Sequence, residues 1–518
     1  TDGAEYALED GSDEPYATLF SRADLTLNGT GALTVTSAYR HAVCSKDDLV
    51  ITGGTYVVSA VEDALRGRDC VKIADGDFTL IAGGDGVKSN KDTKATKGFV
   101  SIDGGTFVIE AGDDGIQAQT YLRIVGGDIS IAAVDDALHS NLEGLLAGGA
   151  LDIEAGDDAF HAETKLVIDD GTVNVKACYE GYEAEKLYIN GGDTHIVASD
   201  DAINAAAADL GDDGADAAAD ASAEAPGSEG GTLPDGMEAP EGAPDGMTPP
   251  DGVNGMDGEA PELPEGAETP DATGGTPPSG APQRNGEGAN ERELNGGAPD
   301  NAFAEGGAGG MGMGDENCLI QINGGYTVLD AQGDGVDSNG SVEITGGVLL
   351  VCGPTSNGDG AFDYDLTATV TGGTVLMVGS NGMAQNFTSG EQPFAFAAVS
   401  GSAGQNVAVV DSDGTVVASF TAAKQFGMVL ATSPAFVEGG TYSLVIGGTV
   451  TGANADGYTD SGTVEGGSTT EIAASTTASG GMGGLGAGGG GMPAGQGGDV
   501  QRGMRGGAGS GFGGGAAA

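Results

Sequence analysis

Apolar and polar residues alternate in short runs that recur along most of the chain. Residues 104–127, GGTFVIEAGDDGIQAQTYLRIVGG, contain three such runs, which are Phe107-Ile109-Ala111, Ile116-Ala118 and Leu122-Ile124. A period of two residues is typical of a β-strand with one buried face, and Gly and Asp between the runs indicate turns. Helical periodicity is absent from the repeat. The pattern therefore predicts three short strands in each repeating unit.

The unit returns at a nearly fixed spacing. Glycine steps lie 22, 29, 22, 22, 22 and 21 residues apart, at Gly54, Gly76, Gly105, Gly127, Gly149, Gly171 and Gly192, and the spacing resumes at Gly325 and Gly347. The long step contains an extra polar segment, NKDTKATKG (90–98). Three strands per unit without hairpin turns predict stacked coils, since one coil cannot bury its inner face alone. We expect an all-β, right-handed parallel β-helix of about ten 22-residue coils.

Changes in composition divide the chain. We expect an N-terminal cap in 1–39, β-helix in 40–205 and again in 316–390, and a small antiparallel β cap in 391–470, where a DG turn separates two alternating runs. Residues 206–315 are rich in Ala, Asp, Gly and Pro, and residues 471–518 are rich in Gly. Both compositions predict disorder. The first of the two segments is then an excursion from a single turn of the helix.

An acidic residue recurs nine residues after each glycine step. We call this series the acid ladder, and its members are Asp63, Asp85, Asp114, Asp136, Asp158, Glu180, Asp201 and Asp334. A first acid precedes it in several coils, at Glu62, Asp113, Asp135, Asp157 and Asp200. The residue three positions after each ladder acid is expected to point outward. We call this second series the outer column, and its members are Arg66, Lys88, Gln117, His139, His161, Glu183 and Asn204.

The acid ladder has two interpretations. Asp and Gly form turns, and an Asp side chain can bind a backbone amide two residues on. Alternatively, coils about 4.8 Å apart bring the carboxylates into mutual repulsion, which a bridging cation offsets. Calcium takes six to eight oxygen ligands, and neighbouring acid pairs supply such ligands. A doubled acid repeated in several coils favours calcium.

The composition of the chain excludes some classes of binding partner. The chain has 518 residues, a formal net charge of −59 and no Trp. That charge repels nucleic acid and anionic lipid and attracts hard cations. No apolar run is long enough to span a membrane, and the start TDGAEY is typical of a processed N-terminus. The five cysteines fit neither a disulfide framework nor a zinc site, so we expect isolated buried thiols.

The repeated segments GGDISIAAVDDALHS, GGALDIEAGDDAFHA, SDDAINAA and GDGVDSNGSVEITGG resemble the clostridial-type calcium- and carbohydrate-binding β-helix family, over about 40–205 and 316–450. The resemblance implies a bacterial extracellular or cell-surface protein with a fold like that of polysaccharide lyases. It implies calcium at the acid ladder and at Asp113, Asp135, Asp157 and Asp200, and sugar binding along the outer column. His41 stands where the first coil would carry its acid, so that coil lacks a full calcium site.

The resemblance implies cellulose or an acidic plant-wall polysaccharide as the target. Because Trp, the usual stacking residue for crystalline cellulose, is absent, uronic acids such as polygalacturonate are favoured. Tyr179 beside Glu180 is a candidate for stacking on a sugar ring, whereas Tyr182 belongs to the inward column.

Other functions stay open. A calcium-dependent polysaccharide lyase needs a base, and Lys88 beside Arg66 and Asp85 is the candidate. A structural or adhesive surface stalk without sugar specificity suits the Gly-rich segments. His139 and His161 occupy one column in adjacent coils, but two histidines without a third ligand predict a zinc site only weakly. We expect a non-catalytic protein.

Overall fold

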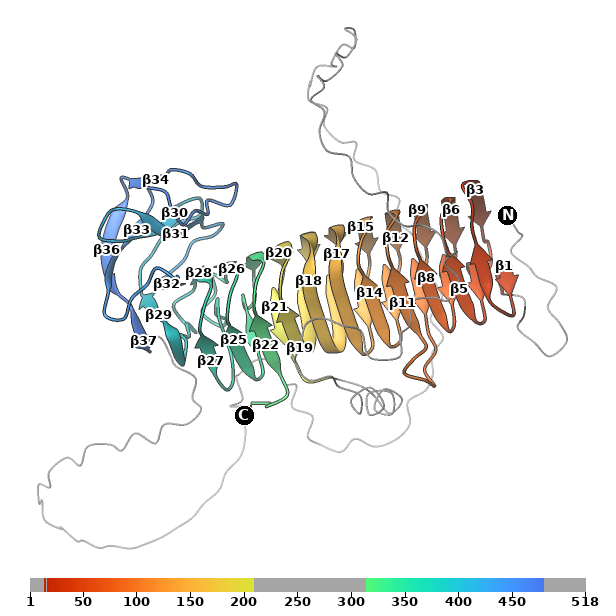
Figure 1. Cartoon of the computed structure of the whole chain (residues 1–518), viewed down its shortest axis with the longest axis horizontal. Coiled ribbons are helices and arrows are strands. Elements are labelled where there is room, and N and C mark those ends of the chain that lie inside the picture. Colours follow the sequence, from red (N-terminus) through yellow and green to blue (C-terminus); the bar gives the residue numbers. More distant parts are fainter. Residues whose placement is uncertain (1–13, 15, 209–313, 479–518) are drawn as a thin grey trace, which may run out of the picture. The chain divides into compact units, whose positions relative to one another are not determined.

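The computed structural model describes residues 14, 16–208 and 314–478. All regular secondary structure in this part of the chain is β-strand. Most strands pair in parallel with strands one coil later and not with their neighbours in sequence, which forms a β-solenoid of about 12 turns. Figure 1 shows the strands following one another in chain order from β1 to β28 along the stack. The predicted all-β parallel helix is confirmed, with about 12 turns and not the expected number of about ten.

Most coils contribute one strand to each of three parallel sheets. The first sheet contains β1 (Ala17–Ser21), β4 (His41–Ser45), β7 (Leu65–Gly67), β10 (Val87–Ser89), β13 (Ile116–Ala118), β16 (Leu138–Ser140), β21 (Ile203–Ala205) and β24 (Asp337–Ser338). The second contains β2 (Leu25–Leu27), β5 (Asp48–Ile51), β8 (Cys70–Ile73), β11 (Phe99–Ile102), β14 (Tyr121–Ile124), β22 (Leu319–Ile322), β25 (Ser341–Ile344) and β27 (Ala368–Val370). The third contains β3 (Ala32–Thr36), β6 (Thr55–Ala60), β9 (Asp77–Ala82), β12 (Thr106–Ala111), β15 (Asp128–Ala133), β20 (Asp193–Ala198), β23 (Tyr326–Ala331), β26 (Val348–Cys352) and β28 (Thr374–Gly379).

Three long strands continue from one sheet into the next without a break. They are β17 (Glu143–Glu154), β18 (Phe160–Cys178) and β19 (Tyr182–Ile189). The pairing of β17 with β18 contains register irregularities, including one between Leu146 and Ala147. Such an irregularity bends a strand, which lets it turn the corner between two sheets.

The sequence period reappears as the pairing register. Val100 pairs with Leu122, and Thr106 pairs with Asp128, at the common spacing of 22 residues. Phe107 pairs with Phe78 at the long spacing, and residues 90–98 form a segment without strand between β10 and β11. In-register stacking therefore places the same position of successive coils side by side.

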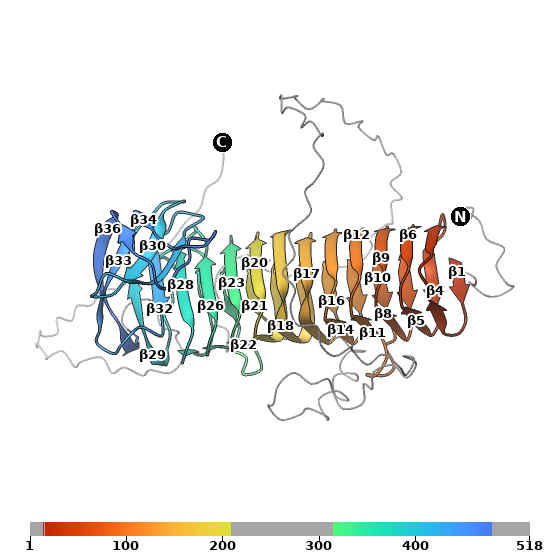
Figure 2. The ribbon, with the colours of Figure 1, turned by 45° about the horizontal axis from the view of Figure 1, so that its top comes forward.

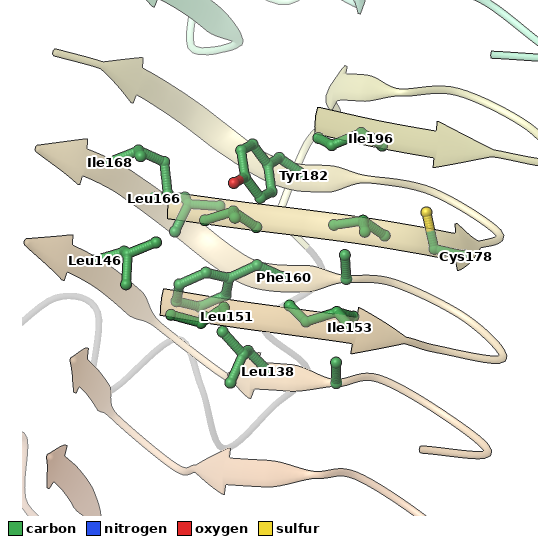
Figure 3. Close-up of a cluster of buried hydrophobic side chains, with 14 of the residues drawn as sticks. Leu138, Leu146, Leu151, Ile153, Phe160, Leu166, Ile168, Cys178, Tyr182 and Ile196 are labelled. Atoms are coloured by element: carbon green, nitrogen blue, oxygen red, sulfur yellow. The ribbon is translucent and has the colours of Figure 1, made fainter. Parts of the chain in front are cut away.

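The inward positions form a continuous core. Ile116, Leu138, Phe160 and Tyr182 are buried and follow one another up the first sheet. Figure 3 shows Leu138, Phe160 and Tyr182 pointing into the same interior as residues from the other two sheets, such as Leu151 and Ile168. Tyr182 is thus a core residue, as expected.

An aromatic stack runs through the third sheet. The rings of Tyr56 and Phe78 lie 5.0 Å apart between centroids, and those of Phe78 and Phe107 lie 4.5 Å apart, both nearly parallel. Coils at strand spacing bring identical positions to the distance that ring stacking requires. The repeat itself therefore creates the stack.

The N-terminal coil begins earlier than the sequence indicated. Residues 1–39 were expected to form a cap, yet β1, β2 and β3 pair in parallel with β4, β5 and β6. The solenoid thus starts at Ala17. The repeat is hard to see there because this coil has no ladder acid.

The strands that flank the insertion pair with the same strand. β21 and β22 each pair in parallel with β19, so the chain leaves and re-enters within one turn. The expected disorder of 206–315 falls mostly on residues 209–313, and that of 471–518 mostly on residues 479–518; both lie outside the described residues.

Antiparallel strands follow the last coils. β32 (Met428–Thr432) pairs antiparallel with β28 and with β29 (Ser389–Ala397), and β37 (Ser475–Thr477) pairs antiparallel with β29. A separate four-stranded sheet contains β30 (Asn406–Val410), β31 (Val416–Thr421), β33 (Thr441–Ile446) and β36 (Ser468–Ala473), and a two-stranded sheet contains β34 (Thr449–Val450) and β35 (Val464–Glu465). Figure 2 shows these strands beyond β28, at the end of the stack opposite to β1. Strands reach residue 477, so the cap extends past the expected limit of 470.

Two further predictions from the sequence concern the cysteines and membrane-spanning segments. Cys44, Cys70, Cys178, Cys318 and Cys352 are buried free thiols, as expected. Within the described residues, no helix has the length and hydropathy to cross a membrane.

Candidate metal and carbohydrate site

The acid ladder forms one column beside the first sheet. The amide of the residue after each ladder acid donates to the carbonyl of the acid one coil later, as in Ala137 to Asp158 and Ala202 to Asp334. Asp63, Asp85, Asp114, Asp136 and Asp158 are all at most 5% exposed. Both the predicted column and its order are therefore present in the fold.

Each aspartate of the first coils binds the backbone of the next coil. Oδ1 accepts a hydrogen bond from the amide of the following ladder residue, at 3.3 Å from Asp63 to Asp85, 3.1 Å to Asp114, 3.2 Å to Asp136 and 2.8 Å to Asp158. If these acids were local turn formers, each would accept a hydrogen bond from the amide two residues later in the chain. In the structure, the donor amide belongs to the next coil instead. One carboxylate oxygen of each aspartate is thus a structural acceptor between coils.

The ladder has a defined beginning and end. At its start, Nδ1 of His41 lies 3.3 Å from the amide of Asp63, in the position that a carboxylate occupies elsewhere. At its end, the amide of Gly360 donates to Oδ1 of Asp334. Gly360 has no side chain to continue the column, so the ladder stops there.

The second carboxylate oxygen faces the outer column. In the early coils it meets a basic partner three residues on: Oδ2 of Asp63 lies 2.9 Å from Nη1 of Arg66, and Oδ2 of Asp85 lies 2.5 Å from Nζ of Lys88. The next coil carries the neutral Gln117 at this position, and histidines follow in the two coils after it, with His139 Nδ1 at 2.6 Å from Asp136 and His161 Nδ1 at 3.2 Å from Asp158. These partners offset much of the ladder's repulsion.

The outer column loses its basic residues in the later coils. Glu183 and Asn204 follow His161 in register, and Asp337 follows Asn204. Nδ2 of Asn204 donates to Oε2 of Glu180 at 2.9 Å. Among the residues that the structure describes, no Lys, Arg or His forms an ion pair with Asp201, Asp334 or Asp337. This end of the site is therefore acidic without compensation by the protein.

Burial changes the ionisation of the acids at this end. Desolvation raises the pKa of Asp201 to about 7 and that of Asp334 to about 8, although each accepts a backbone hydrogen bond that acts in the opposite direction. Desolvation together with the charge of Asp201 raises the pKa of Asp337 to about 7. A bound cation would reverse such shifts, because it favours the charged carboxylates.

Desolvation also raises the pKa of ladder acids in the earlier coils. Desolvation raises the pKa of Asp85 to about 6 in spite of Lys88, and raises that of Asp114 to about 7. Burial lowers the pKa of His161, but the hydrogen bond to Asp158 and the charge of Glu183 outweigh burial and raise the pKa to about 9. His161 is therefore protonated at neutral pH when no metal is bound.

Among the described residues, three groups of potential metal ligands consist of carboxylates alone. Their oxygens lie within 4.8 Å of one another, and the groups are Asp85-Asp113-Asp114, Asp135-Asp136-Asp157 and Asp201-Asp334-Asp337. Two oxygens that each lie about 2.4 Å from one calcium ion are at most about 4.8 Å apart, so this spacing fits the ion. Calcium between the acid pairs of neighbouring coils would join Asp113 and Asp114 to Asp135 and Asp136, whereas the structure joins Asp113 and Asp114 to Asp85.

Some predicted metal ligands lie outside these groups. Asp63 is held by Arg66 and by His41, whose Nδ1 is 3.1 Å from Oδ2 of Asp63. Glu180 and Asp200 belong to no group of three, and Asp158 groups with His161 and Glu183. Sequence reasoning missed Asp337, although it stands three residues after Asp334 and so continues the outer column.

The predicted sugar contacts vary in accessibility. Tyr179 is 46% exposed and lies between Asp157 and Asp200 in the first-acid column, joined to both by backbone hydrogen bonds. A hydrogen bond to the carboxylate of Asp200 raises the pKa of the Tyr179 hydroxyl to about 12. Lys88, Gln117, His139, His161, Glu183 and Asn204 are partly exposed along the adjacent outer column. One surface therefore combines an accessible aromatic ring with polar side chains.

Comparison with known proteins finds a match for the first part of the chain. A family model described as a carbohydrate-binding domain-containing protein matches residues 1–145 and, in a second match, residues 136–223. This part of the chain is similar to that carbohydrate-binding family. The matched residues carry the acid ladder from Asp63 to Asp201, and the match supports a carbohydrate-binding role. No curated protein and no solved structure matches the chain.

Proposed function

We infer that this protein is an extracellular, non-catalytic carbohydrate-binding protein that requires calcium and prefers an acidic polysaccharide of the polygalacturonate type. The similarity of residues 1–223 to a carbohydrate-binding family supports the general role. The calcium requirement and the acidic target rest on the chemistry of the acid ladder.

One observation carries the calcium requirement, namely the group of Asp201, Asp334 and Asp337. Their carboxylate oxygens lie within 4.8 Å of one another and are partly buried. Three carboxylates at this spacing repel one another strongly unless protons or a cation intervene. A calcium ion accepts such oxygens and retains further coordination positions for water or ligand.

Those remaining positions favour an acidic sugar. A uronate carboxylate would complete the shell of an ion held by Asp201, Asp334 and Asp337, and hydroxyl groups would then meet Asn204 and Tyr179. Without the ion, a chain of net charge −59 repels a polyuronate. We expect neutral crystalline cellulose to bind more weakly than a polyuronate, because the protein has no Trp to stack on it.

Lys88 is the reason for proposing binding without cleavage. A β-elimination needs a neutral base next to the sugar ring. Nζ of Lys88 lies 2.5 Å from the buried Oδ2 of Asp85, and the lysine side chain is only 20% exposed. The ammonium group in this position is paired with the carboxylate of Asp85 and offsets its charge, so it is not placed as a free base beside a sugar ring.

The test measures binding of polygalacturonate and of cellulose by the full chain, first with calcium and then with chelator. We expect polygalacturonate to bind with calcium only, and more weakly at high salt as charges are screened. The double change Asp334→Asn with Asp337→Asn should remove one calcium ion and most of the affinity. The double change Asp77→Asn with Asp128→Asn is the matched control, because it removes the same number of charges from exposed positions of the third sheet.

The same samples address the alternatives. Steady formation of unsaturated product that disappears in Lys88→Ala would make the protein a lyase. Calcium binding with no affinity for any tested glycan would favour a surface stalk, and glycan binding that survives chelation would exclude the calcium requirement.

A further inference from the structure

His139 and His161 form a pair that the calcium hypothesis does not use. They are register partners in adjacent coils, and their ring centroids lie 5.1 Å apart with an interplanar angle of 31°. Their side chains are 19% and 22% exposed, so one edge of the pair meets solvent. Parallel stacking of two coils thus presents two imidazoles side by side.

Carboxylates surround this pair. Oδ2 of Asp136 lies 2.6 Å from Nδ1 of His139 and 4.0 Å from Nδ1 of His161. The same nitrogen of His161 lies 3.2 Å from Asp158 and 3.6 Å from Glu183, and Nε2 lies 3.7 Å from Glu163. In the described part of the chain, no Lys or Arg forms an ion pair with Asp136, Asp158 or Glu183.

We propose that His139, His161 and Asp136 form a binding site for one first-row transition-metal ion of the zinc class. The ligand atoms of these three residues all lie within 4.8 Å of one another, with the carboxylate on the ladder side and the two imidazoles on the outer column. Two nitrogens and one carboxylate oxygen form a common zinc set that leaves a fourth position open.

The nitrogen ligands separate this site from the oxygen-only groups. Imidazole suits Zn²⁺, Cu²⁺ and Ni²⁺, whereas Ca²⁺ and Mg²⁺ prefer oxygen. Zinc ligands at about 2.0–2.1 Å from the ion stand about 3.4 Å apart in a tetrahedron. The separations of 2.6 Å and 4.0 Å from Asp136 bracket that value, so modest side-chain rotations suffice.

Asp158 and Glu183 lie beside this site and add negative charge. Both approach Nδ1 of His161, and with that residue they form a second group of three potential ligands. Because one nitrogen binds one ion, the two groups share a single metal. Glu183 then stabilises the ion from beside the ligands and does not serve as one of them. The site shares Asp136 with the oxygen-only group Asp135-Asp136-Asp157, and its two imidazoles belong to the outer column. Its nitrogen ligands nevertheless distinguish it, and it requires only the folded coils that carry His139 and His161.

The experiment titrates Zn²⁺ into the full chain, without a polyhistidine tag, in excess Ca²⁺ that occupies oxygen-only sites. Calorimetry should give one Zn²⁺ per chain, and Co²⁺ in its place should produce the visible absorption of a nitrogen-ligated ion. His139→Gln and His161→Gln should each abolish the site and the absorption. Glu183→Gln should weaken zinc binding about 10–100-fold, as neighbours of ligands do.

His195→Gln is the matched control. His195 also lies between carboxylates, 3.4 Å from Asp193 and 3.2 Å from Asp456, but it has no second histidine beside it. We expect its loss to leave zinc stoichiometry unchanged, and circular dichroism should show all variants folded. Absence of a zinc site in excess calcium, or equal stoichiometry in wild type, His139→Gln and His161→Gln, would overturn the proposal.

Discussion

The amide of Asp158 donates a 2.8 Å hydrogen bond to Oδ1 of Asp136, one coil earlier. This bond gives a buried carboxylate a role in the stack that is separate from metal binding. Oδ1 joins the coils, while Oδ2 faces His139 in this coil, as Oδ2 of Asp63 faces Arg66 and Oδ2 of Asp85 faces Lys88 in earlier coils. The same residue type therefore has a different balance of charge in each coil, according to its partner three residues on.

Two matched substitutions should separate these roles. Asn retains an oxygen for the interstrand hydrogen bond but removes the charge. In chelator at pH 8, we expect Asp334→Asn to stabilise the fold, because it relieves repulsion with Asp201 and Asp337. Asp63→Asn should destabilise it by about 1–3 kcal/mol, because Arg66 loses its charged partner. Denaturant unfolding measures both, and a loss of stability in Asp334→Asn would contradict this account.

Stability without calcium should fall as the pH rises. The folded-state pKa values of Asp201, Asp334 and Asp337 are raised to about 7, 8 and 7, above those of an unfolded chain. The folded protein therefore holds protons more tightly, and this contribution is complete below about pH 4 and is lost as pH rises through about 7–8.

Thermal unfolding in chelator between pH 5 and 8.5 checks this dependence. We expect a decline of several degrees, and calcium at saturating concentration should reduce it, since an ion bound only to the folded state stabilises that state. A melting temperature that rises over this range in chelator would show that these carboxylates are ionised and compensated.

The aromatic stack should contribute strongly to stability. Phe107 is 1% exposed and stacks on Phe78. Phe107→Ala should cost about 3–5 kcal/mol through lost burial and the cavity that remains. Val108→Ala, at the neighbouring outward position that is 47% exposed, should change the free energy of unfolding by less than about 0.5 kcal/mol. Similar effects of the two changes would argue against the stack.

One glycine of the repeat should resist substitution. Gly105 has a φ of +105°, and a Cβ atom there would lie 2.7 Å from the carbonyl oxygen of Gly76 in the preceding coil. Gly105→Ala therefore combines backbone strain with a collision against rigid backbone. Gly404, with a φ of +77° and no atom within 4 Å of such a Cβ, isolates the strain alone, about 1–2 kcal/mol. We expect Gly105→Ala to lower the melting temperature more than Gly404→Ala.

Much of the site was predictable because the coils stack in register. A spacing of 22 residues places His139 beside His161 and Gln117 beside His139, so columns can be read from the sequence. The burial of Tyr182 followed from the alternation of apolar residues. Asp337 fell outside the prediction because the insertion interrupts the spacing, although its offset from Asp334 is the usual one.

The sequence by itself determined the architecture, since period-two alternation with a constant repeat leaves parallel coils as the way to bury every inner face. Only the tertiary structure decided which oxygen of each acid meets an amide, which acids gain a basic partner, and that Gly360 ends the ladder. Those outcomes depend on side-chain direction and local desolvation, which neighbouring coils impose. The start of the solenoid at Ala17 and the antiparallel pairing of β32 with β28 likewise depend on contacts between coils, which a weak local alternation does not reveal.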